Sequence, residues 1–132
     1  MAAEKLIVNQ AYTGAVLAEL EMHDSAQVDN MLSTAQALHQ SGCLPEHERI
    51  RILQNLAKLV DAEHEDFSCL IANEGGKPIR DARVEVTRAV NGIYIAITEI
   101  ENSKGVVIPM DLSAAGVGHE AFTILEPIGV VV

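Results

Sequence analysis

The sequence has little positive charge and few aromatic side chains. Lys and Arg number 9 against 19 Asp and Glu, the formal net charge is −10, and there is no Trp and only two each of Tyr and Phe. Phosphate binding needs an excess of Lys and Arg, and stacking on bases needs aromatic rings. We therefore expect no nucleic acid partner, and anionic membrane surfaces are disfavoured for the same reason.

Cysteines and long apolar runs are also scarce. Two Cys do not read as a disulfide framework. No apolar stretch approaches the ~20 residues of a membrane helix. The N-terminus lacks the basic segment and long apolar run of a secretory signal. We therefore expect a soluble, cytoplasmic protein with no membrane association.

What the chain does contain is enough apolar sequence for one folded domain. Apolar residues make up 48% of the 132 residues, which argues against disorder. A domain of this size buries about two-thirds of the surface that its unfolded chain exposes, so a core is possible. The chain has no internal repeats that would indicate a solenoid.

The segment 73–101 holds the clearest structural signals. Gly75 and Gly76 accept positive φ and suit a helix C-cap, and Pro78 suits the first turn of the next helix. Apolar residues then recur at helical spacing, which predicts a long amphipathic helix that ends near 104–105. The predicted buried stripe of this helix is Ala82, Val86, Ala89, Val90, Ile93, Ile97 and Ile100.

The first forty residues predict a hairpin followed by a helix. Residues 4–22 read as two short strands around a turn whose most permissive position is Gly14. Asp24 is a helix N-cap candidate, and Gln27 completes a capping-box pattern. This helix is expected to end near Gly42.

Two more helices are expected before the Gly75–Gly76 stop. Pro45 opens the first of them, with acidic residues in its first turn. The predicted buried stripe of this helix is Ile50, Leu53, Leu56, Ala57 and Val60. The apolar face of the next helix is predicted to be Phe67, Leu70 and Ile71.

After Gly105 the pattern becomes extended. Short strands are expected at 106–108 and 122–125, with a loop between them. The run Ile128–Val132 is continuously apolar, as in a strand buried on both faces of a parallel sheet. Such a strand needs neighbours and a crossover helix, which these residues do not supply. We therefore expect other polypeptide to cover it.

Two motifs suggest ligands but stand in the wrong context. His39, Cys43 and His47 are possible zinc ligands at four-residue spacing, but Gly42 and Pro45 break the helix between them and no fourth ligand follows. Scattered polar loop residues are expected there instead.

The second motif, GVGHEA at 116–121, matches the dinucleotide-binding spacing G-x-G-x-x-A. That fingerprint functions only between a strand and a helix N-terminus, and here a strand pattern follows it. A hairpin loop is the expected structure.

Residues whose side chains could take part in catalysis are also explained by structural roles. Cys69 is expected to be a packed helix cysteine, since His64 lies five residues back and acidic neighbours oppose a thiolate. Glu74, beside Gly75–Gly76 and Lys77, is expected to be a solvated residue of the last helical turn. A mixed-charge exposed face with i,i+3 and i,i+4 pairs is expected for Arg80, Asp81, Arg83, Glu85 and Arg88.

The order of these features resembles the N-terminal part of the aldehyde dehydrogenase superfamily. The combination E-x-GKP-x-x-x-AR-x-EV, which begins at Glu74, is followed by IP-x-D from Ile108 and by EPIGVV from Glu126. The resemblance spans about Tyr12 to Val132. Departures are minor: Gln10–Ala11 stands where the family often has Asn-Pro, and Gly75 stands where a Thr or Ser is common.

The resemblance implies an α/β fold of the family type. Residues 1–132 would be a single partial domain, mostly α-helical, that flanks a cofactor-binding domain. It would comprise a hairpin at 4–22, helices over 24–104, a hairpin of the kind that pairs subunits at 105–127, and the first strand of the nucleotide-binding parallel sheet at 128–132.

The resemblance also implies an NAD- or NADP-dependent enzyme that oxidises an aldehyde to an acid. Such an enzyme forms a thiohemiacetal on cysteine, transfers hydride to the nicotinamide and hydrolyses the thioester. In the family the cysteine, the general-base glutamate and the nicotinamide-binding residues lie C-terminal to this segment. We therefore assign no catalytic, cofactor-binding or metal-binding role to Glu74, Cys43 or Cys69, and expect no cofactor to bind this segment alone.

The expected partners are the remainder of the enzyme chain or homologous subunits in a homo-oligomer. A competing hypothesis is a non-catalytic oligomerisation or regulatory partner that docks on a full-length homologue through 122–132. A third is an acidic helical binding module.

Overall fold

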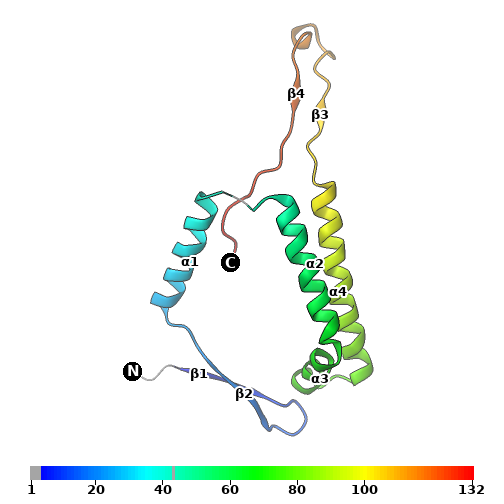
Figure 1. The fold of residues 1–132 in the computed structure, drawn as a ribbon. Coiled ribbons are helices and arrows are strands. Elements are labelled where there is room, and N and C mark those ends of the chain that lie inside the picture. The colour runs from blue at the N-terminus through cyan, green and yellow to red at the C-terminus, as the bar shows by residue number, and fades with distance from the viewer. Residues whose placement is uncertain (1–3, 43) are drawn as a thin grey trace.

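Four helices and two β-hairpins make up the computed structural model, which describes residues 4–42 and 44–132 (Figure 1). Their order is β1 (Lys5–Asn9), β2 (Val16–Glu21), α1 (Ser25–Gln40), α2 (Glu46–Ala62), α3 (His64–Gly75), α4 (Ile79–Asn102), β3 (Val107–Ile108), the 3₁₀ turn η1 (Ala114–Gly116) and β4 (Ala121–Phe122). The predicted fold class, mostly helical with a hairpin at each end, is confirmed.

The core lies where α4 packs along α2 and against α3. Figure 1 shows α2 and α4 side by side over most of their length, with α3 folded beneath them. The apolar residues buried here are Ala57 of α2 and Ala82, Val86 and Ile97 of α4. The predicted stripe of α4 is therefore confirmed in outline, although Ala89 is exposed. On α2 the predicted stripe is half-buried or buried except for Leu56, which is also exposed.

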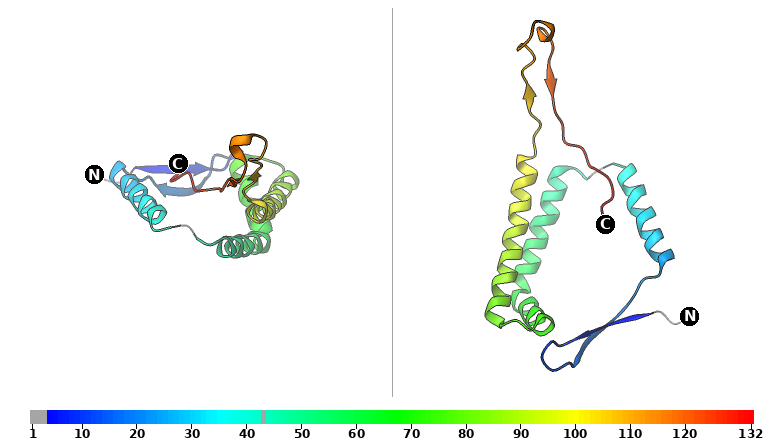
Figure 2. Two further views of the ribbon diagram at one scale, coloured as in Figure 1. Left: turned by 90° about the horizontal axis from the view of Figure 1, so that it is seen from above. Right: turned by 180° about the vertical axis from the view of Figure 1, so that it is seen from behind.

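Helix α1 stands apart from this core. Two opposite views agree that an open space separates α1 from α2 and α4 (Figures 1 and 2). No residue of α1 is buried. The capping box is present as predicted, since the Gln27 amide donates to Asp24 Oδ1 at 2.8 Å and the Asp24 amide donates to Gln27 Oε1 at 2.9 Å. The N-terminal end of α1 is thus fixed locally, while its larger apolar side chains, Val28, Met31, Leu32 and Leu38, are exposed.

Strands β1 and β2 form the predicted antiparallel hairpin. Lys5 pairs with Glu21 and Val8 with Ala18, and the register shifts by a bulge between Val8 and Asn9. Gln10 organises the turn, because its side-chain oxygen accepts hydrogen bonds from the amides of Tyr12 and Thr13 and from the Thr13 hydroxyl. This hairpin crosses the lower end of the structure below α1 and α3 (Figure 1).

A second hairpin projects from the C-terminal end of α4 (Figure 2). Helix α4 ends at Asn102, two residues earlier than expected, and at Gly105 a Cβ would collide with the Thr123 carbonyl oxygen of the returning chain. Strands β3 and β4 pair over only two residues each, so the expected strands at 106–108 and 122–125 are shorter than predicted. One cause is Pro109, which cannot donate a ladder hydrogen bond.

Thr123 still pairs with Val106, its amide donating to the Val106 carbonyl at 2.9 Å. Residues 124–132 then run back from this hairpin into the open space without strand pairing. A parallel strand exists only through its neighbour, and the described residues offer none beside this segment. The expectation that 128–132 is the first strand of a larger sheet therefore stays a prediction.

Helix α4 carries one buried and one exposed isoleucine two residues apart, and this difference predicts how substitutions change stability. Ile97 is 7% exposed and Ile95 is 62% exposed. We expect Ile97→Ala to lower the free energy of unfolding by about 2–5 kcal/mol through lost burial and a residual cavity. Ile95→Ala should change it by no more than about 0.5 kcal/mol. Urea unfolding followed by circular dichroism measures both, and equal effects would contradict this packing.

Candidate functional site

The segment around Gly76 joins three elements. Gly76 caps α3 in the left-handed region with φ 64°, as predicted, and Gly75 is the last helical residue. The Ala11 amide, in the β1–β2 turn, donates to the Asn73 carbonyl at 3.0 Å. A Cβ at Gly76 would lie 3.1 Å from the Ala11 Cβ. The glycine thus ends α3, redirects the chain into α4 and leaves room for the hairpin turn.

Charged side chains around this joint pair between elements. Lys77 pairs with Glu85 of α4. Arg83 of α4 makes two hydrogen bonds to Glu65 of α3, Nη2 to Oε1 at 2.6 Å and Nε to Oε2 at 2.9 Å. The predicted i,i+3 and i,i+4 pairs within 80–88 are wrong, because the turn at 76–78 folds α3 back along α4 and offers Arg83 a better-oriented carboxylate.

The Arg83–Glu65 pair shifts the protonation of both groups. The hydrogen bond from Arg83 lowers the pKa of the Glu65 carboxyl below its ordinary 4.5, and the same bond raises the pKa of Arg83. Neither shift points to acid–base catalysis, because both stabilise the charged forms that these groups already have at neutral pH. Glu74, as predicted, is an exposed residue of the last turn of α3.

Cys69 is exposed, so the prediction of a packed helix cysteine is wrong. The residue of α3 that is buried is its neighbour Ser68, which is 0% exposed and donates its hydroxyl to the His64 carbonyl at 2.7 Å. Of the predicted apolar face of α3, Phe67 and Leu70 are exposed, whereas Ile71 is half-buried. The register of α3 on α4 therefore places the small Ser68 in the contact and leaves Phe67 and Leu70 largely in solvent.

His64 does not contact Cys69 as a base would. Its Nε2 lies 3.1 Å from the Thr87 hydroxyl oxygen. That hydroxyl donates to the Arg83 carbonyl at 3.0 Å, so the ring nitrogen is the donor in the His64–Thr87 bond. His64 therefore ties α3 to α4, and the arrangement contains no nucleophile–base pair.

The possible metal ligands fall on separate elements. His39 is in the last turn of α1 and His47 is in the first turn of α2, while Cys43 lies outside the described residues. Within 4–42 and 44–132 no three His, Cys, Asp or Glu side chains come close enough together to hold a metal ion.

The loop at 116–121 is a hairpin loop, as expected. Gly116 ends the turn η1, Gly118 has φ 83°, and β4 begins at Ala121. A Cβ at Gly116 would collide with the Met110 carbonyl oxygen, so glycine is needed here to close the loop. No helix N-terminus follows to meet a pyrophosphate, and the residues present do not fit a dinucleotide.

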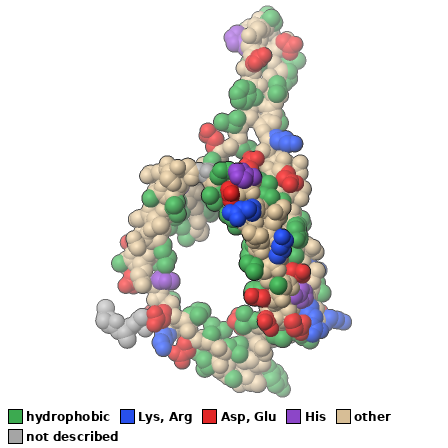
Figure 3. All heavy atoms as spheres, in the orientation of Figure 1, with side chains coloured by type: hydrophobic (Ala, Val, Ile, Leu, Met, Phe, Trp, Pro, Cys, Tyr) green, Lys and Arg blue, Asp and Glu red, His purple; other side chains and the backbone are tan. Residues whose placement is uncertain are grey.

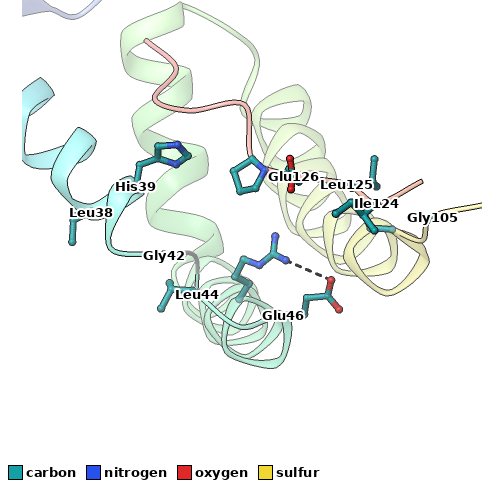
Figure 4. A pocket seen from close by; sticks show the side chains of 12 residues that line it. Leu38, His39, Gly42, Leu44, Glu46, Gly105, Ile124, Leu125 and Glu126 are labelled. Carbon is teal, nitrogen blue, oxygen red and sulfur yellow. Dashed lines mark ion pairs between the residues drawn. The ribbon is translucent and has the colours of Figure 1, made fainter. Parts of the chain in front are cut away.

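A cavity that the sequence did not indicate lies between the end of α1, the start of α2 and the segment 124–127 (Figure 4). It has a volume of about 820 Å³ and is open to solvent. Figure 4 shows His39 facing this space. Pro127 also lines the cavity, as do Arg49 and Glu46, whose side chains form a long ion pair at 3.8 Å. The residues that line this cavity are far apart in the sequence, so no local sequence pattern predicts it.

Comparison with known proteins identifies the family. The sequence model described as "Aldehyde dehydrogenase family" matches residues 1–132. The aldehyde-dehydrogenase-like protein y4uC of Sinorhizobium fredii is 32% identical over 127 residues, which are 96% of this chain and 25% of that protein. The 3-sulfolactaldehyde dehydrogenase of Priestia megaterium is 31% identical over 129 residues, which are 98% of this chain and 27% of that enzyme.

Solved structures agree with the sequence comparison. Aldehyde dehydrogenase 21 from Physcomitrella patens, in complex with the reaction product succinate, superposes with a TM-score of 0.86 at 28% identity. That match covers 92% of this chain and 25% of the moss enzyme. The glyceraldehyde-3-phosphate dehydrogenase GapN from Methanocaldococcus jannaschii, complexed with NADP, has a TM-score of 0.76 at 27% identity and covers 83% of this chain and 24% of its own. This chain thus spans about a quarter of the length of the relatives that it matches.

The lowered pKa of Glu65 predicts a pH dependence of stability. A carboxyl whose pKa is lower in the folded than in the unfolded chain stabilises the fold above the unfolded-state pKa, and this contribution is lost as the pH falls below about 4.5. Glu65→Gln should therefore lower the melting temperature at pH 7 and have a smaller effect at pH 3.5. Thermal unfolding at both pH values checks this. The exposed Glu99→Gln is the control, and a Glu65→Gln effect that grows toward acid would contradict the assignment.

Proposed function

The chain belongs to the aldehyde dehydrogenase family, and we propose that it forms the N-terminal flank of the cofactor domain in an NAD(P)-dependent enzyme that oxidises an aldehyde to an acid. The observation that carries this proposal is the match of the whole chain, in sequence and in fold, to the corresponding quarter of such enzymes. The low cysteine count supports a place in the cytoplasm.

In this proposal the described residues of the chain are structural rather than catalytic. Cys69 has no base beside it, since His64 is held by Thr87. In the loop with dinucleotide-binding spacing, Gly116 lies close against the Met110 carbonyl, and strand β4 follows the loop. The cofactor and the reacting cysteine therefore belong to the rest of the enzyme, and this segment supports the sheet on which they sit.

The projecting β3–β4 hairpin supports a role in subunit pairing. Its apolar side chains are largely in solvent: Val107 is 83% exposed, Leu112 84% and Phe122 72%. A strand pair that carries such side chains away from the core is suited to an interface between subunits. The same exposure is what favours the second candidate function, in which the chain is a non-catalytic partner that docks on a full-length homologue.

The activity of a chimera tests the main proposal. Residues 1–132 replace the matching quarter of the 3-sulfolactaldehyde dehydrogenase of Priestia megaterium, and oxidation of the aldehyde is followed by the absorbance of NADH or NADPH. We expect activity from the chimera and none from the isolated chain or from the truncated relative, because each lacks part of the enzyme. Oxidation by the isolated chain, or a chimera no better than the truncated relative, would overturn the proposal.

The proposed subunit-pairing role predicts that a charged substitution in the β3–β4 hairpin weakens the association of subunits. In the chimera, Phe122→Asp should lower the native mass measured by light scattering, since burying a carboxylate in an apolar interface is costly. Tyr12→Asp is the control, because Tyr12 is 93% exposed at the tip of the other hairpin. If both variants keep the parental mass, the hairpin does not pair subunits.

A further inference from the structure

Helix α3 has a thin apolar contact with its neighbours. Its buried residue is the small Ser68, and Ile71 and Ala72 are half-buried. Two of its large apolar side chains, Phe67 and Leu70, are exposed. Burial of so little apolar area contributes little to the attachment of this helix, so other contacts must hold it in place.

Polar side chains link α3 to α4. Arg83 makes two hydrogen bonds to Glu65, and His64 is hydrogen-bonded to Thr87. Figure 3 shows acidic, basic and histidine side chains together at this end of the molecule, over α3 and the adjoining end of α4. The Arg83 and Glu65 side chains are 50% and 57% exposed, so dissolved ions reach the pair. A rise in salt from 0.1 M to 1 M shortens the screening length from about 10 Å to about 3 Å and weakens such an exposed pair.

Helix α3 cannot remain a stable helix once it leaves α4. It has 12 residues, and isolated helices shorter than about 12–15 residues are marginal in water. Its N-cap residue, Glu63, makes no side-chain capping hydrogen bond. Detachment of α3 and its unfolding are therefore one event.

The N-terminal hairpin depends on α3 for its attachment. The Ala11 amide, in the turn of the hairpin, donates to the carbonyl of Asn73 in the last turn of α3. Ala11 also lies close to Gly76, the C-cap of α3. Unfolding of α3 displaces both contacts and so releases the hairpin turn.

We propose that residues 63–76 form a salt-sensitive unit, the α3 corner, which opens and unfolds while α2 and α4 stay packed, and which releases the N-terminal hairpin when it opens. The Arg83–Glu65 pair sets how often the α3 corner opens. The attachment of the hairpin thus responds to ionic strength, although neither charge of the pair lies in the hairpin. This device goes beyond the proposed function and does not depend on it.

Replacement of Arg83 tests the proposal by residue-resolved hydrogen exchange of the 132-residue chain, measured by NMR. In Arg83→Gln we expect the amides of 68–75 and of Ala11 to exchange about two- to fivefold faster, since an exposed pair makes a modest contribution. Amides of 53–62 in α2 and 93–100 in α4 should keep their rates. Arg80→Gln is the matched control, because the Arg80 side chain is 88% exposed and pairs with the adjacent Asp81 of its own helix. Arg83 is replaced rather than Glu65, because Glu65 lies in the first turn of α3, where the helix dipole also favours a carboxylate.

Ionic strength provides a second measurement on the unmutated chain. Exchange at 68–75 and at Ala11 should be faster in 1 M than in 0.1 M sodium chloride, while the rates in α2 and α4 stay the same. Arg83→Gln should lose most of this difference, because it lacks the pair that salt screens. A salt response that persists in Arg83→Gln assigns the effect to another pair, such as Lys77–Glu85, and overturns the proposal.

The other outcomes are equally decisive. Equal acceleration in α2, α3 and α4 shows that the chain opens as a whole, which overturns the proposal. An Ala11 amide that keeps its rate while α3 exchanges faster also overturns it, because the hairpin is then held by other contacts. Lack of protection in α2 and α4 of the unmutated chain contradicts it as well, since the α3 corner is defined by opening beside a stable pair of helices.

Discussion

The packing of α4 on α2 and α3 is the contact on which the rest of this structure depends. Every apolar residue that is buried among the described residues lies on α2 or α4. The other elements attach to this unit at its ends: the N-terminal hairpin through the Ala11–Asn73 hydrogen bond, and the second hairpin through the end of α4. Because α1 and the last ten residues have no buried side chain to hold them, their positions depend on these attachments.

The local features of the fold follow from the sequence, since each depends on residues close together in the chain. The capping box of Asp24 and Gln27 and the left-handed cap at Gly76 need only a few neighbouring residues, and both are predicted correctly. The stripe of α4 follows from periodicity, and only Ala89 departs from it. A methyl group is so small that burying or exposing it changes the free energy little, which is why the pattern is weakest there.

What the sequence does not predict depends on how elements meet. The exposure of Cys69 and the burial of Ser68 reflect a register between two helices, and adjacent residues of a helix point in different directions. The pairing of Arg83 with Glu65 joins residues 18 apart, on either side of a turn. The cavity beside His39 forms only where α1, α2 and the segment 124–127 come together in the fold, so no local sequence pattern predicts it. For the candidate site, sequence patterns correctly predicted a helix cap at Gly76 and a loop at 116–121. Both features depend on residues that are close together in the chain.

Ala57, Ser68 and Ala82 are each 0% exposed, and all three are small. Small side chains at these positions allow the helices to approach one another closely. Such a contact restricts the size of a side chain more than its polarity. At position 68 a change between serine and alanine keeps the spacing, whereas a valine forces the helices apart and displaces everything attached to them. The outer faces of these helices can therefore accept changes in charge and hydrophobicity, whereas positions 57, 68 and 82 accept little change in size.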